Sequence, residues 1–117
     1  MAQVLIVEDH ATNRKLFRDV LQLNGFSTAE AANSKEALDY FVNNSNTPKV
    51  IIVDVGLPGE MSGLELITHL AAPNKTWKII AVTGYTSAED RELIFYHGAD
   101  YYLSKPVSLP EFIELVR

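Results

Sequence analysis

Four short apolar runs in this sequence are followed by side chains that could do chemistry. These side chains are a pair of carboxylates, a third carboxylate, a hydroxyl and an amine: Glu8 with Asp9, Asp54, Thr83 and Lys105. Three carboxylates that meet in a fold repel one another unless a cation joins them. An all-oxygen ligand set favours Mg2+, which keeps several waters and takes few protein ligands. The three acids therefore predict a magnesium site, provided that the fold brings them together.

A carboxylate beside such a cation can also attack a phosphoryl group and form an aspartyl phosphate. This transfer depends on positioning and on neutralising the phosphoryl oxygens more than on acid–base groups. We expect Mg2+ and Lys105 to neutralise these oxygens and the Thr83 hydroxyl to donate a hydrogen bond to one of them. The chemistry requires residues from remote parts of the chain to converge.

The apolar runs have the pattern of strands that are buried on both faces. The expected strands are Val4–Val7, Ser27–Ala31, Val50–Val53, Ile79–Val82 and Tyr101–Leu103. Segments with helical spacing of apolar residues follow each of them, near residues 12–23, 34–42, 64–70, 87–96 and from 108 onward. Five repeats of strand and helix predict a parallel sheet with helices on both faces and all strand C-termini at one edge. A site in such a sheet lies at that edge, so the chemical residues should meet there.

Local signals also predict where some helices begin. Ser34 is the expected N-cap of the second helix. Ser108 and Glu111 have the spacing of a capping box at the fifth helix, with Pro110 in its first turn.

Length and composition limit the classes of protein that fit. The 117 residues suit one domain, residues 1–117, and the composition is that of a soluble globular chain. The formal charge of −5 argues against nucleic-acid binding. The sequence has no cysteine and no apolar run near the ~20 residues that span a bilayer, and it begins with a strand pattern and not a signal peptide. We therefore expect a cytoplasmic protein that does not contact membranes.

Four sequence blocks carry a family resemblance. They read Val-Leu-Ile-Val-Glu-Asp, Ile-Ile-Val-Asp-Val-Gly-Leu-Pro, Ala-Val-Thr-Gly and Tyr-Leu-Ser-Lys-Pro. In order and spacing they resemble the receiver domains of response regulators in two-component signalling, over almost the whole chain. The chain is most similar to stand-alone receivers of the cell-division-regulator type or to receivers of hybrid kinases. The resemblance implies a flavodoxin-like doubly wound α/β fold, a (βα)5 unit with strand order 2-1-3-4-5 and five helices.

The same resemblance implies a role for each matching residue. Asp54 is the expected phosphoacceptor, with Thr83 and Lys105 assisting. The expected Mg2+ ligands are Glu8, Asp9, Asp54 and the Gly56 carbonyl. Thr83 and Tyr102 are the expected switch residues, and the bond from Lys105 to Pro106 is expected to be cis.

The implied function is a phosphorylation-activated switch of a phosphorelay. A histidine kinase or histidine phosphotransfer protein would supply the phosphoryl group, and signalling would proceed through protein contacts. A downstream target would contact the fourth helix, fifth strand and fifth helix. The chain would catalyse only its own phosphorylation and dephosphorylation. Whether it is a stand-alone receiver or part of a larger response regulator or hybrid kinase stays open.

Two other functions are weighed against this one. An aspartyl phosphohydrolase of the common type needs a second aspartate two residues after the nucleophile, and Gly56 occupies that position. A degenerate receiver that only binds partners does not need the intact acidic set.

One departure from the family follows the expected phosphoacceptor. The segment from Pro58 to Gly63 carries an apparent one-residue insertion at Gly59–Met61. The third helix could start differently as a result, and whether Glu60 comes nearer the metal stays open.

The first helix offers two neighbouring apolar stripes. We expect Leu16, Val20 and Leu23 to pack on the sheet. The second stripe, flanked by basic residues, is predicted to dock the phosphodonor protein: Asn13, Arg14, Phe17 and Leu21. The alternative is that Phe17 and Leu21 belong to the core.

Overall fold

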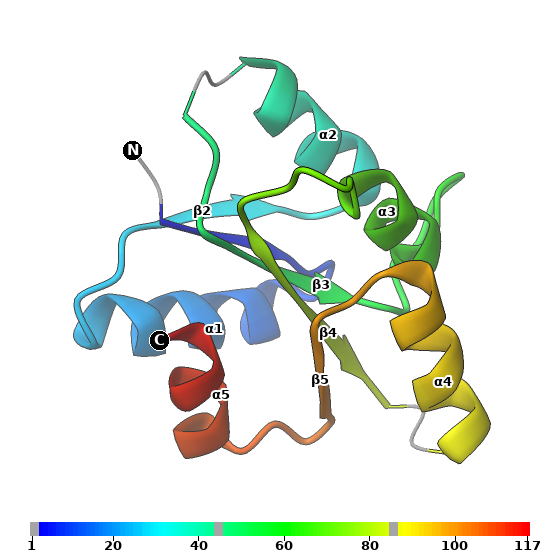
Figure 1. The fold of residues 1–117 in the computed structure, drawn as a ribbon. Helices are drawn as coiled ribbons and strands as arrows, with labels where there is room; N and C mark the ends of the chain where they lie inside the picture. The colour runs from blue at the N-terminus through cyan, green and yellow to red at the C-terminus, as the bar shows by residue number, and fades with distance from the viewer. Residues whose placement is uncertain (1–2, 44–45, 85–86) are drawn as a thin grey trace.

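Five parallel strands form one sheet in a computed structural model that describes residues 3–43, 46–84 and 87–117 (Figure 1). The strands are β1 (Val4–Val7), β2 (Thr28–Ala31), β3 (Val50–Asp54), β4 (Lys78–Thr83) and β5 (Tyr101–Ser104). The helices are α1 (Ala11–Leu23), α2 (Ser34–Asn43), α3 (Gly63–Leu70), α4 (Ala88–His97) and α5 (Leu109–Val116). The strand order β2-β1-β3-β4-β5 confirms the predicted fold class.

Two apolar layers enclose the sheet because alternate strand residues point to opposite faces. Leu5 and Ile51 are buried beneath α2, α3 and α4, whereas Ile6 and Ile52 are buried beneath α1 and α5. Figure 1 shows these two groups of helices on opposite sides of the sheet. The three central strands are buried on both faces, which explains their continuous apolar sequences.

The strand register brings the chemical residues to one edge. Val7 pairs with Val53 across β1 and β3, so Glu8 and Asp54 follow at the same level. Asp54 in turn pairs with Val82, and Thr83 pairs with Ser104. Residues that leave β1, β3, β4 and β5 therefore emerge side by side, as the sequence predicts.

The predicted division of α1 into a sheet-facing stripe and a docking stripe is wrong, although Val20 packs partly buried against the core as expected. Phe17 and Leu21 are buried in the core, where the Phe17 ring packs on Phe112 of α5 with 4.9 Å between ring centroids. Leu16 is 46% exposed and Leu23 is 86% exposed. A core side chain cannot meet a partner, so Phe17 and Leu21 are not docking residues.

Two helix starts also differ from expectation. Asn33, and not Ser34, caps α2, since its Oδ1 accepts a hydrogen bond from the Glu36 N–H at 2.9 Å. Ser108 precedes α5 but its side chain makes no capping hydrogen bond. A complete capping box occurs at α3 instead, between Ser62 and Glu65. The segment after Pro58 thus ends in a well-defined helix start.

None of the helices in the described parts of the chain is long and apolar enough to cross a membrane.

Candidate functional site

An acidic cluster lies at the C-terminal edge of the sheet. Glu8 and Asp9 follow β1, and Asp54 ends β3. Each offers one carboxylate oxygen, and the three oxygens lie within 4.8 Å of one another. The structure therefore brings together the three acids that the sequence singled out.

Glu8 has the most constrained environment of the three. Its side chain is 1% exposed, and Oε2 is buried without a hydrogen-bond partner among the described residues. The Lys105 Nζ is the nearby cation, at 3.8 Å from Oε2. Burial and the adjacent Asp54 carboxylate raise the pKa of Glu8 to about 7, although Lys105 and the His10 N–H oppose the shift. A buried oxygen without a donor fits a metal ligand, because a bound cation would supply the missing partner.

Asp54 is held as a carboxylate. Its Oδ1 accepts a hydrogen bond from the Gly56 N–H at 2.9 Å, and Oδ2 accepts one from Lys105 Nζ at 3.0 Å. Burial alone would raise the pKa of Asp54, but these hydrogen bonds and the Lys105 charge bring it below its usual value. An ionised, positioned carboxylate is the form that a nucleophile requires.

Thr83 and Lys105 complete the same edge from β4 and β5. Thr83 is buried, and its carbonyl accepts a hydrogen bond from the Lys105 N–H at 2.8 Å. Burial lowers the pKa of the Lys105 amine, but the contact with Asp54 outweighs it and leaves the pKa raised. The predicted cis bond between Lys105 and Pro106 is present.

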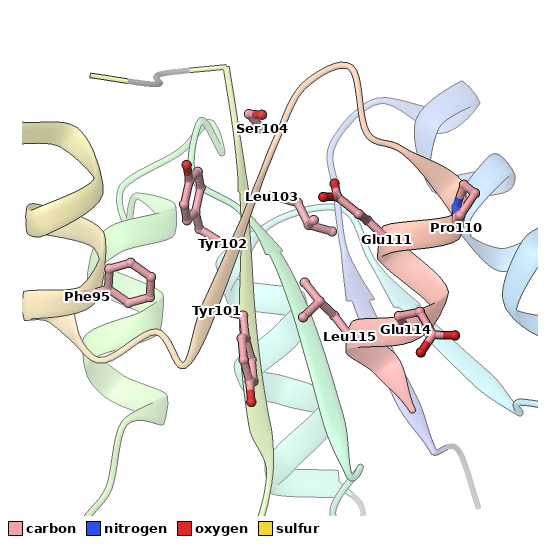
Figure 2. A pocket seen from close by; sticks show the side chains of 9 residues that line it. All are labelled: Phe95, Tyr101, Tyr102, Leu103, Ser104, Pro110, Glu111, Glu114 and Leu115. Atoms are coloured by element: carbon pink, nitrogen blue, oxygen red, sulfur yellow. The ribbon is translucent and has the colours of Figure 1, made fainter. Parts of the chain in front are cut away.

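Tyr102 lies on the α4 side of β5 and is partly buried. Its ring packs edge-on against Phe95 at 6.0 Å between centroids, and its hydroxyl accepts a hydrogen bond from Arg91 at 3.3 Å. Figure 2 shows Tyr102 and Phe95 turned toward each other between β5 and α4. These contacts place the predicted switch aromatic next to the predicted output surface.

The loop from Pro58 to Ser62 does not extend the acidic cluster. Gly56 lies beside Asp54, but Glu60 is exposed and lines a groove of ≈ 840 Å³ against the start of α2. The acidic cluster found among the described residues does not include Glu60. Ser34 Oγ donates a hydrogen bond to the Met61 carbonyl at 3.0 Å and so ties the loop to α2. Sequence reasoning missed this role of Ser34.

The end of this loop, at Gly63, lies against the end of β3, where the loop begins. A side chain on Gly63 would collide with the backbone carbonyl of Asp54 and with Val55. The first turn of α3 therefore packs directly on the backbone of the candidate phosphoacceptor, and only glycine allows this approach.

Comparisons with known proteins agree with this geometry. Residues 4–117 match the family model described as the response regulator receiver domain. The chain is 40% identical, over 116 residues, to the polar-differentiation response regulator DivK of Brucella anthropi, covering 97% of this chain and 92% of that protein. A response regulator receiver protein from Pseudomonas putida is 32% identical, with a TM-score of 0.85 over 97% of this chain and 93% of that one. A CheY-like receiver domain protein from Methanospirillum hungatei has a TM-score of 0.87 at 29% identity, over 99% and 90% of the two chains.

Proposed function

The chain belongs to the response regulator receiver domain family of two-component signalling, and from this premise we propose that Asp54 is its phosphoacceptor. Members of this family are signalling switches rather than metabolic enzymes. The observation that carries the assignment is the position of the Asp54 carboxylate, which accepts a hydrogen bond from the Lys105 amine at 3.0 Å and belongs to the acidic cluster with Glu8 and Asp9. Among the three acids, Asp54 is the one that lies closest to Lys105, at 3.0 Å against 3.8 Å for Glu8.

The acidic cluster is proposed to hold Mg2+. The ligands would be Glu8, Asp9, Asp54 and the Gly56 carbonyl. The unpartnered oxygen of Glu8 supports the proposal, because its environment lacks a positive partner within hydrogen-bond distance. A bound Mg2+ would neutralise phosphoryl oxygens during transfer.

In the proposed transfer, an Asp54 carboxylate oxygen attacks the phosphorus of a phosphohistidine. The new O–P bond forms as the P–N bond breaks, and the bond electrons return to the imidazole of the donor. The Lys105 amine donates a hydrogen bond to Asp54 Oδ2 in the unphosphorylated protein, and it would donate to a phosphoryl oxygen instead after transfer. The Thr83 hydroxyl would donate to another.

A histidine kinase or histidine phosphotransfer protein is the proposed donor. Its phosphohistidine must reach Asp54 from the edge at which β1 and β3 end, and α1 begins beside that edge. Phe17 and Leu21 are buried, so a contact through α1 would use exposed residues such as Leu16. We place this exchange in the cytoplasm, because response regulators are generally cytoplasmic.

The proposed output surface is the face formed by α4, β5 and α5. Side chains from these three elements line a groove of ≈ 720 Å³, shown in Figure 2. Leu103 and Leu115 lie on its apolar floor, and Glu111 and Glu114 lie along its α5 side. A downstream protein partner would contact this face, and Tyr102 belongs to the same lining.

The proposal is tested by labelling with a small phosphodonor such as acetyl phosphate. In the presence of Mg2+, intact mass spectrometry should show one added phosphoryl group on the wild type. Asp54→Asn, or wild type in excess chelator, should show none. Label that persists in Asp54→Asn, or labelling that is undiminished in chelator, would refute the assignment.

A further inference from the structure

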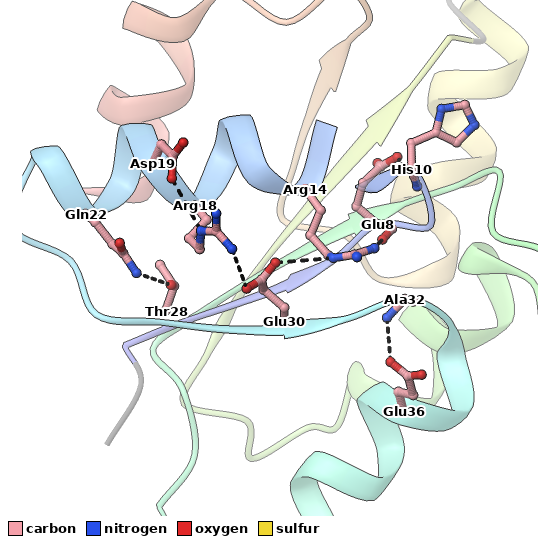
Figure 3. A network of polar contacts seen from close by, with 10 residues as sticks. All are labelled: Glu8, His10, Arg14, Arg18, Asp19, Gln22, Thr28, Glu30, Ala32 and Glu36. Atoms are coloured by element: carbon pink, nitrogen blue, oxygen red, sulfur yellow. Dashed lines mark hydrogen bonds and ion pairs between the residues drawn. The ribbon is translucent and has the colours of Figure 1, made fainter. Parts of the chain in front are cut away.

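Arg14 joins the acidic pair to strand β2. Its Nη1 donates a hydrogen bond to the backbone carbonyl of Glu8 at 2.9 Å, and its Nε donates to Glu30 Oε1 at 3.2 Å. The side chain is 22% exposed, and its contact with the Glu8 carbonyl is partly buried, whereas its contact with Glu30 is exposed. Figure 3 shows the guanidinium of Arg14 between Glu8 and Glu30. Arg14 thus bridges β2 to the residue that opens the metal site.

Three further hydrogen bonds hold the turn that carries the acidic pair. The Glu8 N–H donates to the Ala31 carbonyl at 3.0 Å, and Glu8 Oε1 accepts from the His10 N–H at 3.2 Å. The His10 carbonyl accepts from the Arg14 N–H at 2.9 Å. The Glu8 carbonyl is the group that the Arg14 side chain holds. Without the Arg14 side chain, this carbonyl loses its charged donor, and the peptide that joins Glu8 to Asp9 is held less firmly.

Glu30 braces the arginine. One Glu30 oxygen accepts from Arg14, and the other accepts from Arg18 Nη1 at 3.4 Å. Arg18 also contacts Asp19, and among the described residues its side chain makes no hydrogen bond to the Glu8–His10 turn. Two arginines one turn apart therefore share Glu30, and Arg14 is the one that reaches the site.

We propose that Arg14 is a positioning residue for the metal site, acting through the Glu8 carbonyl. The inference rests on the proposed function of the acidic cluster. Groups that orient metal ligands without touching the metal typically contribute 10–100-fold to metal affinity. A planar guanidinium can hold the carbonyl and Glu30 at once, whereas an ammonium lacks this fixed fork. The same contacts make Arg14 a poor probe of partner docking, because its replacement would disturb the site itself.

The direction in which Mg2+ affinity changes when Arg14 is replaced distinguishes a positioning role from a purely electrostatic one. Arg14 is a cation near a cation site, so its removal should tighten Mg2+ binding if only long-range electrostatics act. Loss of positioning should weaken binding. The two explanations therefore predict opposite changes.

The test is a calorimetric titration of the metal-free protein with Mg2+, without phosphodonor. We expect Arg14→Gln to weaken binding by about tenfold. The matched control Arg18→Gln loses the same type of side chain and the same Glu30 partner, and its affinity should stay within about twofold of wild type. Arg14→Lys keeps the charge and should also bind more weakly. Unchanged or tighter binding by Arg14→Gln, or equal losses in the two glutamine variants, would overturn the inference.

A second variant covers the case in which Arg14→Gln does not fold. Glu30→Gln leaves Arg14 in place but weakens its brace, and it should lower Mg2+ affinity in the same direction by a smaller factor. Denaturant unfolding in chelator shows whether any variant is destabilised beyond Arg18→Gln. Full Mg2+ affinity in a folded Glu30→Gln variant would then count against the inference. Wild type that binds no Mg2+ would refute the proposed function as well, whereas tight wild-type binding with unaffected Arg14 and Glu30 variants would refute only this inference.

Discussion

At the scale of single residues, two carboxylates of the site, Glu8 and Asp54, lie near the same cationic side chain, Lys105. Lys105 Nζ lies 3.0 Å from Asp54 Oδ2 and 3.8 Å from Glu8 Oε2. Its closer partner is the proposed phosphoacceptor. We therefore expect Lys105 to contact the phosphoryl group and the acidic cluster to hold the metal.

Lys105→Ala should therefore separate the two functions. Mg2+ affinity should be unchanged or higher, because a competing positive charge is removed. The structural response to phosphorylation should be largely lost, since the phosphoryl group loses its charged partner. Mg2+ titration and NMR spectra of the phosphorylated protein measure the two effects. Equal loss of both would reject this division.

The raised pKa of Glu8 predicts a pH dependence of the metal-free protein. The folded state binds a proton at Glu8 up to about pH 7, whereas the unfolded chain releases it near 4.5. The free energy of unfolding should therefore fall as pH rises from 5 to 8, because burying the charged carboxylate becomes costly. Denaturant unfolding in chelator at several pH values measures this slope. Glu8→Gln has no such proton, and a slope that is the same in this variant would contradict the assignment.

At the scale of elements, the first turn of α3 fixes the backbone under Asp54. Gly63→Ala should lower the free energy of unfolding by about 1–3 kcal/mol, because the added methyl group meets the Asp54 carbonyl. Gly84→Ala is the matched control, since a methyl group there meets open space. Chemical denaturation measures both. Equal stability of the two variants would show that the close approach is not needed.

The same scale shows where sequence reasoning succeeds and fails. The strands and the edge at which Glu8, Asp54 and Lys105 meet were predictable, because short buried runs alternate with helical segments. The sequence did not show which stripe of α1 is buried. Two stripes one residue apart had similar spacing, and the choice between them depends on Phe112, which lies far away in sequence.

Two contacts of the site had no usable sequence signal. Arg14 and Glu30 are 16 residues apart and meet only because β2 pairs with β1. The Ser62–Glu65 capping box was visible in the sequence, directly after the apparent insertion at Gly59–Met61. Its spacing could have located the start of α3.

At the scale of the whole molecule, phosphorylation should reach the output face through β4 and β5. Thr83 pairs with Ser104, two residues from Tyr102, whose ring and hydroxyl contact Phe95 and Arg91 of α4. A phosphoryl group on Asp54 would accept a hydrogen bond from the Thr83 hydroxyl and so draw Thr83 toward it. Tyr102 could then move into the space that Thr83 leaves. NMR spectra with and without a phosphoryl mimic should show shifts in α4, β5 and α5. Shifts confined to the loops around Asp54 would show that the coupling is absent.

The central claim is that the phosphoryl group is carried by Asp54 as an acyl phosphate. Its most direct test is borohydride reduction of the phosphorylated protein, followed by peptide sequencing with mass spectrometry. Reduction converts an aspartyl phosphate to homoserine and leaves free carboxylates unchanged. The account predicts homoserine at position 54 and nowhere else, and only when Mg2+ was present during labelling. Unmodified Asp54 in a labelled protein, or a reduced residue at Glu8 or Asp9, would contradict it.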